Sequence, residues 1–375
     1  MPHPVMTRAA GLDALASFLA GSGADYAATR NTDPGRDDAP TTSCLSPYLS
    51  RRLLTEEEVA RAALSVFGER GADKFVSEVF WRTYFKGHLE THPEAWARYR
   101  AGRDAARARL ADEPGLHRTH DRAVAGETGL DGFDAWATQL VEQGFLHNHA
   151  RMWFASIWIF TLRLPWELGA AFFLRHLLDG DPASNTLSWR WVAGLHTRGK
   201  PYLARRDNIR EFTQGRHDPA GLNEDAASLA EEIPPREVPL AHADTAPDGP
   251  VALLLHLDDL APETLPLGNA RVTRVAGLLA SDEEASDTVR AADAAGMADA
   301  LARAAAHFGC PAEPMRDGWA GGLPVVTPWA PVGPSADALP AGCRRIRRAW
   351  DERAWPLSNR GYSRLRGAIP KVMAP

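Results

Sequence analysis

The chain has 375 residues, 42 Lys and Arg against 48 Asp and Glu, and a formal net charge of −6 at pH 7. This length predicts two domains, and the acidic balance excludes a globally basic nucleic-acid-binding protein, although not a local basic groove. The three cysteines, Cys44, Cys310 and Cys343, have no paired spacing, which argues against a disulfide framework and against a zinc site, so we expect no metal.

Nothing in the sequence predicts a targeting or membrane segment. The first residues lack the long apolar core of a signal peptide. The best candidate for a membrane span is interrupted by Arg163, Pro165 and Glu167, and no run reaches the roughly eighteen apolar residues that a span needs. We therefore expect a protein of the reducing cytoplasm without a membrane partner.

The N-terminal part begins with the pattern of a short amphipathic helix at Ala9–Ala20. A hydroxyl-rich cluster, Thr42-Ser43-Cys44-Leu45-Ser46, leads into a later helix. Hydroxyls and free backbone N–H groups at such a position are a usual way to hold phosphates. The same cluster is typical of an N-terminal helix cap, and the residues alone favour the cap.

Residues 75–85 predict a helix on which Glu78, Trp81 and Arg82 share one face. The spacing alone makes Trp81 a packing residue at the boundary of the core.

Two apolar helical runs follow, Arg151–Leu162 and Trp166–Leu178, joined at Arg163–Pro165, where proline ends a helix. Their apolar faces predict burial, and polar groups at the ends of buried helices need partners. A plain buried Arg–Asp bridge and a grip on the polar edge of a planar ligand are both consistent with the residues. The polar residues concerned are His147, Asn148, Arg151, Asp179, Asp181 and Asn185.

Residues 215–249 are rich in Pro, Ala and acidic residues and predict a linker. Beyond them, alternating strand and helix patterns predict a small parallel α/β domain, without a Gly-rich nucleotide fingerprint. The predicted strands are Pro250–Asp258, Arg271–Leu279 and Leu323–Thr327, and the predicted helix is Glu283–Phe308.

The end of the chain is basic. Arg344–Trp355 is basic and amphipathic, and the tail from Arg344 to Lys371 interleaves arginines with Trp350, Trp355 and Tyr362. This tail either contacts DNA or packs on the helical domain, and the residues favour packing.

The central stretch resembles the FAD-binding domain of the DNA photolyase and cryptochrome family, whose pattern it follows without a gap. The turn Gly126–Ala135 also resembles that of the family, with Asp131 in place of a proline. The matching central residues are Gly144-Phe145-Leu146-His147-Asn148, Arg151-Met152, Ala155-Ser156, Trp166, His176-Leu177-Leu178-Asp179-Gly180-Asp181, Asn185, Trp189 and Trp191.

The resemblance implies that FAD is the cofactor. It places the FAD diphosphate on Thr42, Ser43, Cys44, Leu45 and Ser46, and it places a tyrosine that precedes them against the cofactor. The other implied cofactor contacts are Tyr26, Arg82, Arg151, Asp179, Gly180, Asp181 and Asn185.

Three of these contacts have implied roles at the flavin. Arg151 and Asp179 are expected as a buried pair that tunes the redox properties of the ring, while Asp181 bonds its polar edge. Asn185 is expected to face flavin N5. An asparagine there can hydrogen-bond a reduced N5–H without offering an acidic proton, which favours repair over a photoreceptor role.

The same resemblance implies a pocket between Trp81 and Trp191. It would receive a damaged pyrimidine pair that has been extruded from the duplex. Glu78 is expected to hydrogen-bond the pair. Asn148 and Met152 agree with family members that act on cyclobutane dimers, whereas (6-4) enzymes have histidine at both positions. The implied catalytic residues are therefore Glu78, Trp81, Asn148, Met152 and Trp191.

DNA contacts are implied at three positions. Arg30 matches a family arginine that contacts the DNA backbone without reading sequence. His149 stands where the family has an arginine, and the loss of a permanent charge weakens a phosphate contact. Arg205 lies in a similar stretch that is displaced by one inserted residue, which makes it a weaker match.

Electron transfer to the flavin is implied for Trp166 and Trp189, which match the two inner members of the family's chain of three tryptophans. The outer member is Ala123 here. Photoreduction is then expected to be slower or to use another exit. The candidate exits are Trp136, Trp153 and Trp158, among which the sequence does not choose.

These observations predict a mainly α protein, with an all-helical photolyase-type FAD-binding domain at 1–214, a linker at 215–249 and a small α/β domain at 250–375. Members of the family normally begin with an α/β domain that holds an antenna pigment, and this domain is not expected at the start of the chain. We expect the C-terminal domain to take its place as a permuted and reduced version. Whether it holds an antenna pigment stays open.

The implied function is that of a deoxyribodipyrimidine photo-lyase, a carbon–carbon lyase that repairs pyrimidine dimers with reduced FAD and blue light. Damaged DNA is the expected partner and a monomer the expected state. The alternative is a cryptochrome-like photoreceptor without repair activity, which the net charge, His149 and Ala123 favour. A flavin-binding relic is disfavoured because the whole lesion pocket is retained.

Overall fold

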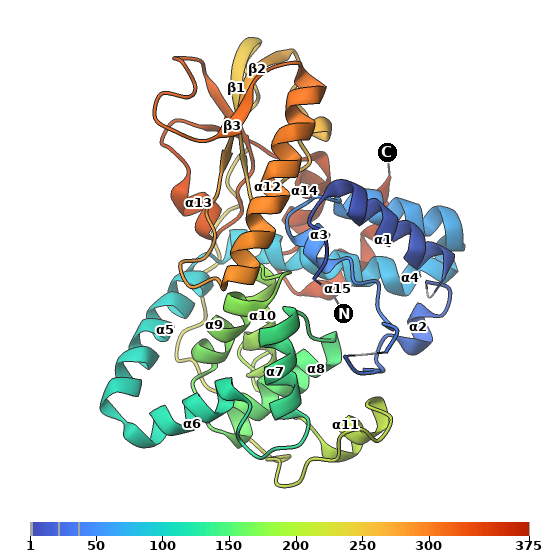
Figure 1. Ribbon diagram of the computed structural model, residues 1–375, viewed down its shortest axis with the longest axis vertical. Coiled ribbons are helices and arrows are strands. Elements are labelled where there is room, and N and C mark those ends of the chain that lie inside the picture. Colours follow the sequence, from blue (N-terminus) through green and yellow to red (C-terminus); the bar gives the residue numbers. More distant parts are fainter. Residues whose placement is uncertain (1–2, 22, 37, 375) are drawn as a thin grey trace. The chain divides into compact units, whose positions relative to one another are not determined.

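The computed structural model describes residues 3–21, 23–36 and 38–374 (Figure 1). Contacts between residues divide the chain into two compact units, each assembled from segments that are far apart in the sequence. Unit 1 consists of Met1–His3, Asp25–Cys44 and Glu94–Arg236. Unit 2 consists of Pro4–Ala24, Leu45–Pro93 and Glu237–Pro375.

The two units do not follow the predicted division at residues 214 and 250. Leu45–Pro93 belongs with the α/β elements because side chains far apart in the chain join them. Trp350 Nε1, for example, donates to Thr83 Oγ1 at 3.0 Å. The two compact units are therefore not successive segments of the sequence, as the predicted domains were.

Residues 215–248 contain neither helix nor strand, but they are attached to their surroundings. In unit 1, Glu231 pairs with Arg190 at 2.7 Å and with Arg98 at 3.1 Å. In unit 2, the N–H of Val238 donates to the Thr91 carbonyl at 2.8 Å.

Unit 1 is helical in the part of it that the structure describes. Asp181 caps its last long helix by accepting from Ser184 N at 2.7 Å, and Pro182 takes the first helical position, where no N–H is needed. The helices are α2 (Tyr26–Thr29), α5 (Glu94–Asp112), α6 (Pro114–Ala125), α7 (Phe133–Gln143), α8 (Asn148–Ser156), α9 (Trp166–His176), α10 (Pro182–Val192) and α11 (Arg206–Phe212).

The predicted break between the two central apolar runs is confirmed. α8 continues into a π-helical turn, Ile157–Thr161, and the chain then leaves the helix at Arg163, which has a φ of 56°. α9 begins directly after Pro165. Trp153 and Trp158 are fully buried, so the apolar faces of these runs lie in the core as predicted.

Unit 2 combines helices with a sheet. α4 begins with a capping box between Thr55 and Glu58, and it is interrupted at Gly68, where φ is 65°. The first helix confirms the prediction at Ala9–Ala20. The helices of unit 2 are α1 (Arg8–Ala20), α3 (Ser46–Ser50), α4 (Glu56–Thr91), α12 (Asp287–Phe308), α13 (Pro334–Ala338), α14 (Ala349–Ala354), α15 (Tyr362–Gly367) and α16 (Ile369–Met373).

The described strands form one parallel five-stranded sheet in the order β3–β2–β1–β4–β5. β1 lies in the middle and is buried from Val251 to His256, as a continuous apolar run in a parallel sheet requires. α12 packs along β2 and β3 (Figure 1). The strands are β1 (Gly249–His256), β2 (Ala270–Leu278), β3 (Ala312–Pro314), β4 (Val325–Pro328) and β5 (Arg344–Ile346).

The predicted α/β elements are confirmed, with boundaries that differ by a few residues. The basic stretch Arg344–Trp355 is not one element, since β5 pairs with β4 and α14 follows it. The chain is thus mainly α with a small parallel α/β part, as predicted. In the described ranges, no helix combines the length and the apolar composition needed to cross a bilayer.

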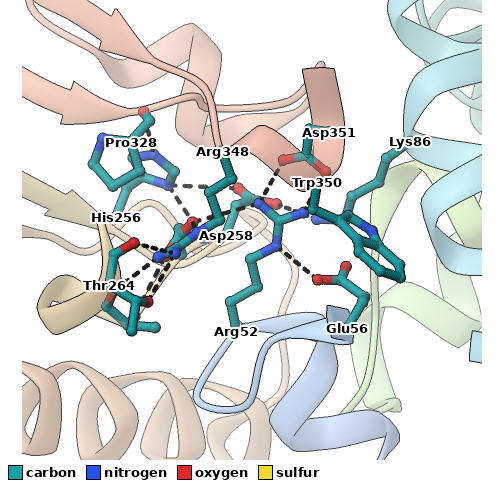
Figure 2. Close-up of polar contacts among 12 residues, drawn as sticks. Arg52, Glu56, Lys86, His256, Asp258, Thr264, Pro328, Arg348, Trp350 and Asp351 are labelled. Atoms are coloured by element: carbon teal, nitrogen blue, oxygen red, sulfur yellow. Dashed lines mark hydrogen bonds and ion pairs between the residues drawn. The ribbon is translucent and has the colours of Figure 1, made fainter. Parts of the chain in front are cut away.

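A buried cluster of charged side chains in unit 2 joins the end of β1 to α14 and to the loop before α4 (Figure 2). Arg52 forms a bidentate pair with Asp351, at 2.7 and 2.8 Å, and donates to Glu56 at 3.0 Å. Arg348 forms a second bidentate pair with Asp259, at 2.6 and 2.7 Å. None of these side chains is more than 9% exposed.

The cluster satisfies the rule that a buried charge needs a partner. Burial alone would raise the pKa of Asp259, but Arg348 and then Arg52 outweigh this effect and lower it to about 2. For Asp351, burial prevails over the opposing effect of Arg52 and raises the pKa. The cluster was not predicted from the sequence, because its members come from distant segments.

Candidate functional site

Arg151 of α8 and Asp179, which follows α9, form an ion pair in unit 1 with an N–O distance of 3.0 Å. Arg151 Nε also donates to the Leu146 carbonyl at 2.9 Å, which fixes the direction of the guanidinium. Asp179 is only 7% exposed, so its charge depends on such a partner. The structure therefore contains an Arg–Asp bridge, one of the two alternatives that the sequence left open, with Asp179 buried and Arg151 partly exposed.

The hydroxyl-rich loop, Thr42-Ser43-Cys44 of unit 1, lies within electrostatic range of this ion pair. Burial raises the pKa of the Cys44 thiol, a hydrogen bond with Thr42 opposes the rise, Asp179 adds to it and Arg151 opposes it. Thr42 Oγ1 lies 3.8 Å from Cys44 Sγ. Cys44 has a φ of 53°, the left-handed backbone that lets successive N–H groups point toward an anion.

The helix cap that the residues favoured here is wrong. Leu45, in unit 2, occupies the N-cap position of α3, and it provides no capping hydrogen bond from its side chain. The alternative use of the hydroxyl-rich loop, as a phosphate-binding segment, remains.

The start of α10 positions further expected contacts. Asp181 accepts from Ser184 N at 2.7 Å, so one carboxylate oxygen serves as the helix cap. Asn185 Nδ2 donates to the Ala170 carbonyl at 2.9 Å, which fixes the amide group. The buried Ser184 Oγ has no hydrogen-bond partner in the described part of the chain. A buried polar atom in this state indicates a place for an additional polar group.

Two histidines at the start of α8 are removed from solvent, His147 fully and His149 in part. Burial lowers the pKa of His147 to about 4 and also lowers that of His149. His149 Nδ1 donates to the Asn31 carbonyl at 2.9 Å, and its ring stacks on Trp153 with 4.2 Å between centroids. His149 thus makes structural contacts at the position where a phosphate contact was expected.

The lesion-binding residues expected in unit 1 lie on α8 and α10. Asn148 and Met152 are four residues apart, so they share one face of α8, with Asn148 exposed and Met152 half-buried. Trp191 stacks on Tyr202, with 5.6 Å between ring centroids and 28° between planes. Of the expected DNA contacts, Arg205 is exposed and Arg30 is half-buried; Tyr26 is buried.

The residues expected on α4 belong to unit 2. Glu78 pairs with Lys74 at 2.9 Å, and both side chains are partly exposed. Trp81 stacks on Tyr362, with 3.7 Å between ring centroids and 16° between planes. Arg82 is half-buried on the same helix.

Tyr362 is the residue at Trp81 that sequence analysis missed. The pattern assigned it to the basic tail, and no local signal connects that tail with α4. Tyr362 Oη also lies 2.8 Å from Ser77 Oγ, so both the ring and the hydroxyl hold it on the helix. Only the long-range fold brings these residues together.

The two expected electron-transfer tryptophans of unit 1 have different neighbours. Trp189 meets Trp158 edge-on, with 6.3 Å between ring centroids. Trp166 contacts Tyr99, at 5.8 Å. Ala123, at the place of the family's outer tryptophan, is fully buried. Of the three candidate exits, Trp158 is the one in ring contact with an expected inner member.

Comparison with known proteins gives the following similarities. Residues 75–222 match the family model described as the FAD binding domain of DNA photolyase. The deoxyribodipyrimidine photo-lyase of Streptomyces griseus is 37% identical over 198 residues, which cover 51% of this chain and 40% of that protein. The corresponding protein of Thermus thermophilus is 35% identical over 223 residues, 59% of this chain and 50% of that protein.

Among solved structures, a class III photolyase from Agrobacterium tumefaciens has a TM-score of 0.47 and 29% identity, over 55% of this chain and 42% of that chain. The chain spans half or less of the length of the Streptomyces and Thermus relatives.

The helices of unit 1, its ion pair beside the hydroxyl-rich loop and the family match define a flavin-nucleotide-binding protein. More particularly, residues 75–222 are similar to the FAD-binding domain of DNA photolyase, and this match supports FAD as the cofactor.

The residues of unit 1 fit this cofactor. Thr42 offers a hydroxyl beside the left-handed turn at Cys44, which suits a diphosphate, and Arg151 forms with Asp179 the charged pair that is expected beside the flavin ring. Ser184 Oγ is buried without a partner among the described residues, so it is available to a polar group of the cofactor. Asn185, whose amide nitrogen is bound by Ala170, presents its oxygen as an acceptor.

Proposed function

We propose that the protein is a deoxyribodipyrimidine photo-lyase that repairs cyclobutane pyrimidine dimers in DNA under blue light. The observation that carries the proposal is the shared face of Asn148 and Met152 on α8, the helix whose Arg151 pairs with Asp179. The relatives named deoxyribodipyrimidine photo-lyase support the same activity. When bound and reduced, FAD supplies the light-driven electron that splits the dimer.

Unit 1 provides the proposed cofactor contacts with the clearest chemistry. The hydroxyls of Thr42 and Ser43 hold the diphosphate by charge-assisted hydrogen bonds. Arg151 and Asp179 form the ion pair beside the flavin that tunes its redox properties, and Asp179, which is buried, helps to orient the partly exposed Arg151. Asn185 accepts a hydrogen bond from flavin N5–H through its amide oxygen and does not offer an acidic proton.

The lesion contacts are proposed for each unit by itself. On α4 of unit 2, Glu78 hydrogen-bonds the damaged pair and stabilises charge that develops on it, while Trp81 offers an aromatic face. On α8 and α10 of unit 1, Asn148 donates to the pair, and Met152 and Trp191 offer apolar contact. Extruding the pair costs a few kcal/mol, least at damaged bases, which favours lesions over normal DNA.

The test is blue-light repair of an oligonucleotide that carries one thymine dimer, with chemically reduced protein. Chemical reduction makes the result independent of the tryptophan path. We expect Glu78→Gln to repair about 10- to 100-fold more slowly, since a hydrogen bond to a charged group is lost. Glu69→Gln, an exposed change on the same helix, is the matched control and should repair normally.

The second candidate is a cryptochrome-like blue-light photoreceptor. The observation in its favour is that Tyr362 covers one face of Trp81, which leaves only the other face for a base. For this function we expect light-dependent protease cleavage within residues 215–249. No repair by fully reduced, FAD-saturated protein would remove the enzyme proposal and leave this one.

For both functions we propose that the protein is a cytoplasmic monomer. The proposal does not include an antenna pigment. The three cysteines, which have no paired spacing, support a reducing compartment.

A further inference from the structure

The last part of the chain differs from the rest in charge. Residues 353–375 contain four arginines and one lysine but no acidic residue, whereas the whole chain has a net charge of −6. Three of these cations, Arg360, Arg364 and Lys371, are exposed on or beside α15 and α16. We call these three residues the C-terminal basic surface.

The segment that presents this surface is fixed on α4, within unit 2. Tyr362 stacks on Trp81 at 3.7 Å between centroids, and its hydroxyl lies 2.8 Å from Ser77 Oγ. Arg366 donates to Ser77 Oγ at 2.9 Å and pairs with Asp73 at 3.0 Å. α15 and α16 therefore lie against α4, where Figure 1 shows α15 (red) beside that helix.

Some cations of the segment attach it to α4, and others do not. Arg366 is used in the attachment to α4. Arg360, Arg364 and Lys371 form no ion pair within the described residues; Arg364 donates only to the neutral amide oxygen of Asn359, at 2.9 Å. Exposed cations that form no ion pair favour an anionic partner.

We propose that the C-terminal basic surface binds the phosphate backbone of DNA next to the base received by Trp81 and Glu78. This inference rests on the proposed function and extends it to a segment outside residues 75–222. Arginine and lysine contacts of this kind position a strand without reading its sequence, and each one releases counterions from the DNA.

DNA fits this surface better than an acidic protein or a lipid headgroup does. Arg360 and Arg364 flank Tyr362 in the sequence at two residues' distance, the Tyr362 ring stacks on Trp81, and Trp81 shares α4 with a carboxylate acceptor, Glu78. Proteins bind unpaired bases by this combination, in which a cationic path holds the backbone and aromatic faces stack the bases. The carboxylate of Glu78 would not contribute to the binding of an acidic peptide or a membrane.

The experiment compares two charge-matched triple variants of the FAD-loaded protein. One neutralises the surface, and the other neutralises three exposed arginines of the α/β part. The substitutions are Arg360→Gln, Arg364→Gln and Lys371→Gln in the first, and Arg271→Gln, Arg290→Gln and Arg316→Gln in the control. Affinity for a labelled dimer-containing oligonucleotide is measured by fluorescence anisotropy over a range of NaCl concentrations.

We expect the slope of log affinity against log salt to fall by about 2 in the surface variant, because each lost phosphate contact removes about 0.7 to 0.9 from it. The control should keep the slope of the natural protein. A third variant, Arg360→Lys with Arg364→Lys, retains the charges and should also keep it. Urea unfolding midpoints of all variants identify any that fail to fold.

The outcomes separate this inference from the function on which it rests. Equal slopes in the surface variant and the control, with blue-light repair intact, overturn the inference alone. A loss of affinity that the lysine variant shares, with folding intact, also overturns it, since charge is then not the cause. A natural protein that neither binds nor repairs the oligonucleotide overturns both.

Discussion

Trp81 of α4 and Tyr362 of α15 stack face to face, with 3.7 Å between ring centroids and 16° between planes. Trp81 is a residue expected to receive a damaged base, and Tyr362 comes from the far end of the chain. The contact therefore joins the proposed lesion-binding helix to the basic C-terminal segment. Tyr362 therefore occupies one face of the Trp81 ring.

Removing the Tyr362 ring should loosen the C-terminal segment. We expect Tyr362→Ala to lower the free energy of unfolding by about 2 kcal/mol, through lost burial and lost ring stacking. Tyr362→Phe keeps the ring and loses only the hydrogen bonds with Ser77, which costs about 1 kcal/mol. Urea unfolding measures both; an equal loss in the two variants would show that stacking contributes little.

The same pair of variants tests how the segment is held for DNA. Tyr362→Ala should reduce the salt dependence of oligonucleotide binding, whereas Tyr362→Phe should preserve it, since only the first releases α15 from α4.

Breaking the buried charge cluster should be costly. Arg52→Met leaves Asp351 and Glu56 buried without their arginine, and we expect a loss of about 3 to 5 kcal/mol in the free energy of unfolding. Adding Asp351→Leu should recover part of it, because an apolar pair replaces the remaining charge. The measurement is urea unfolding of each variant.

An exposed ion pair on α4 provides the control for the cluster. Arg61 and Glu57 are 2.7 Å apart, with 45% and 31% of their side chains exposed. Arg61→Met should cost less than about 1 kcal/mol. A similar cost for Arg52→Met would mean that the cluster is not a strong constraint on the fold.

Stability should fall in mild acid because of His147. Its pKa is lowered from 6.5 to about 4 in the folded protein, so the unfolded chain binds the proton first as pH falls. The stabilisation is complete above pH 6.5 and is lost between pH 6.5 and 4, by up to about 3 kcal/mol.

The difference between the natural protein and His147→Gln isolates this effect. His176, whose pKa is also lowered to about 4, is present in both proteins. Unfolding free energies measured from pH 7 to pH 4 should fall more steeply in the natural protein. Parallel curves would show that His147 titrates normally.

Trp158 should lie on the path by which light reduces the flavin. Its ring meets that of Trp189, at 6.3 Å between centroids, whereas Trp136 and Trp153 stack on each other at 5.5 Å. We expect Trp158→Phe to slow the bleaching of FAD absorbance under blue light with an external reductant. Trp136→Phe is the matched control. At equal FAD content, this variant should bleach as fast as the natural protein. The reverse order would favour the Trp136–Trp153 stack as the exit.

Local patterns were enough for the elements that fold from short stretches of sequence. The apolar run of β1, the alanine-rich α12 and the break at Pro165 were all predicted because their signals lie within one element. The grouping of Arg151 with Asp179 also followed, since both stand at the ends of adjacent predicted helices.

Long-range contacts were beyond local patterns. β5 has three residues, too few for a strand period, and it exists because β4 supplies its partners. Leu45 at the start of α3 replaced the expected hydroxyl cap. Tyr362 stacks on Trp81, and Arg52 pairs with Asp351. The residues next to them in the sequence do not indicate either contact.

The bidentate pair of Arg52 and Asp351 also sets an order for folding during synthesis. Arg52 leaves the ribosome long before Asp351 does, and until α14 is made this guanidinium has Glu56 close by in the sequence but lacks its bidentate partner. Contacts between such distant residues form late, and the incomplete chain exposes apolar surface meanwhile. A nascent chain that already contains all of residues 75–222 is therefore still unfinished around α4, and a fragment cut at residue 236 would remain so.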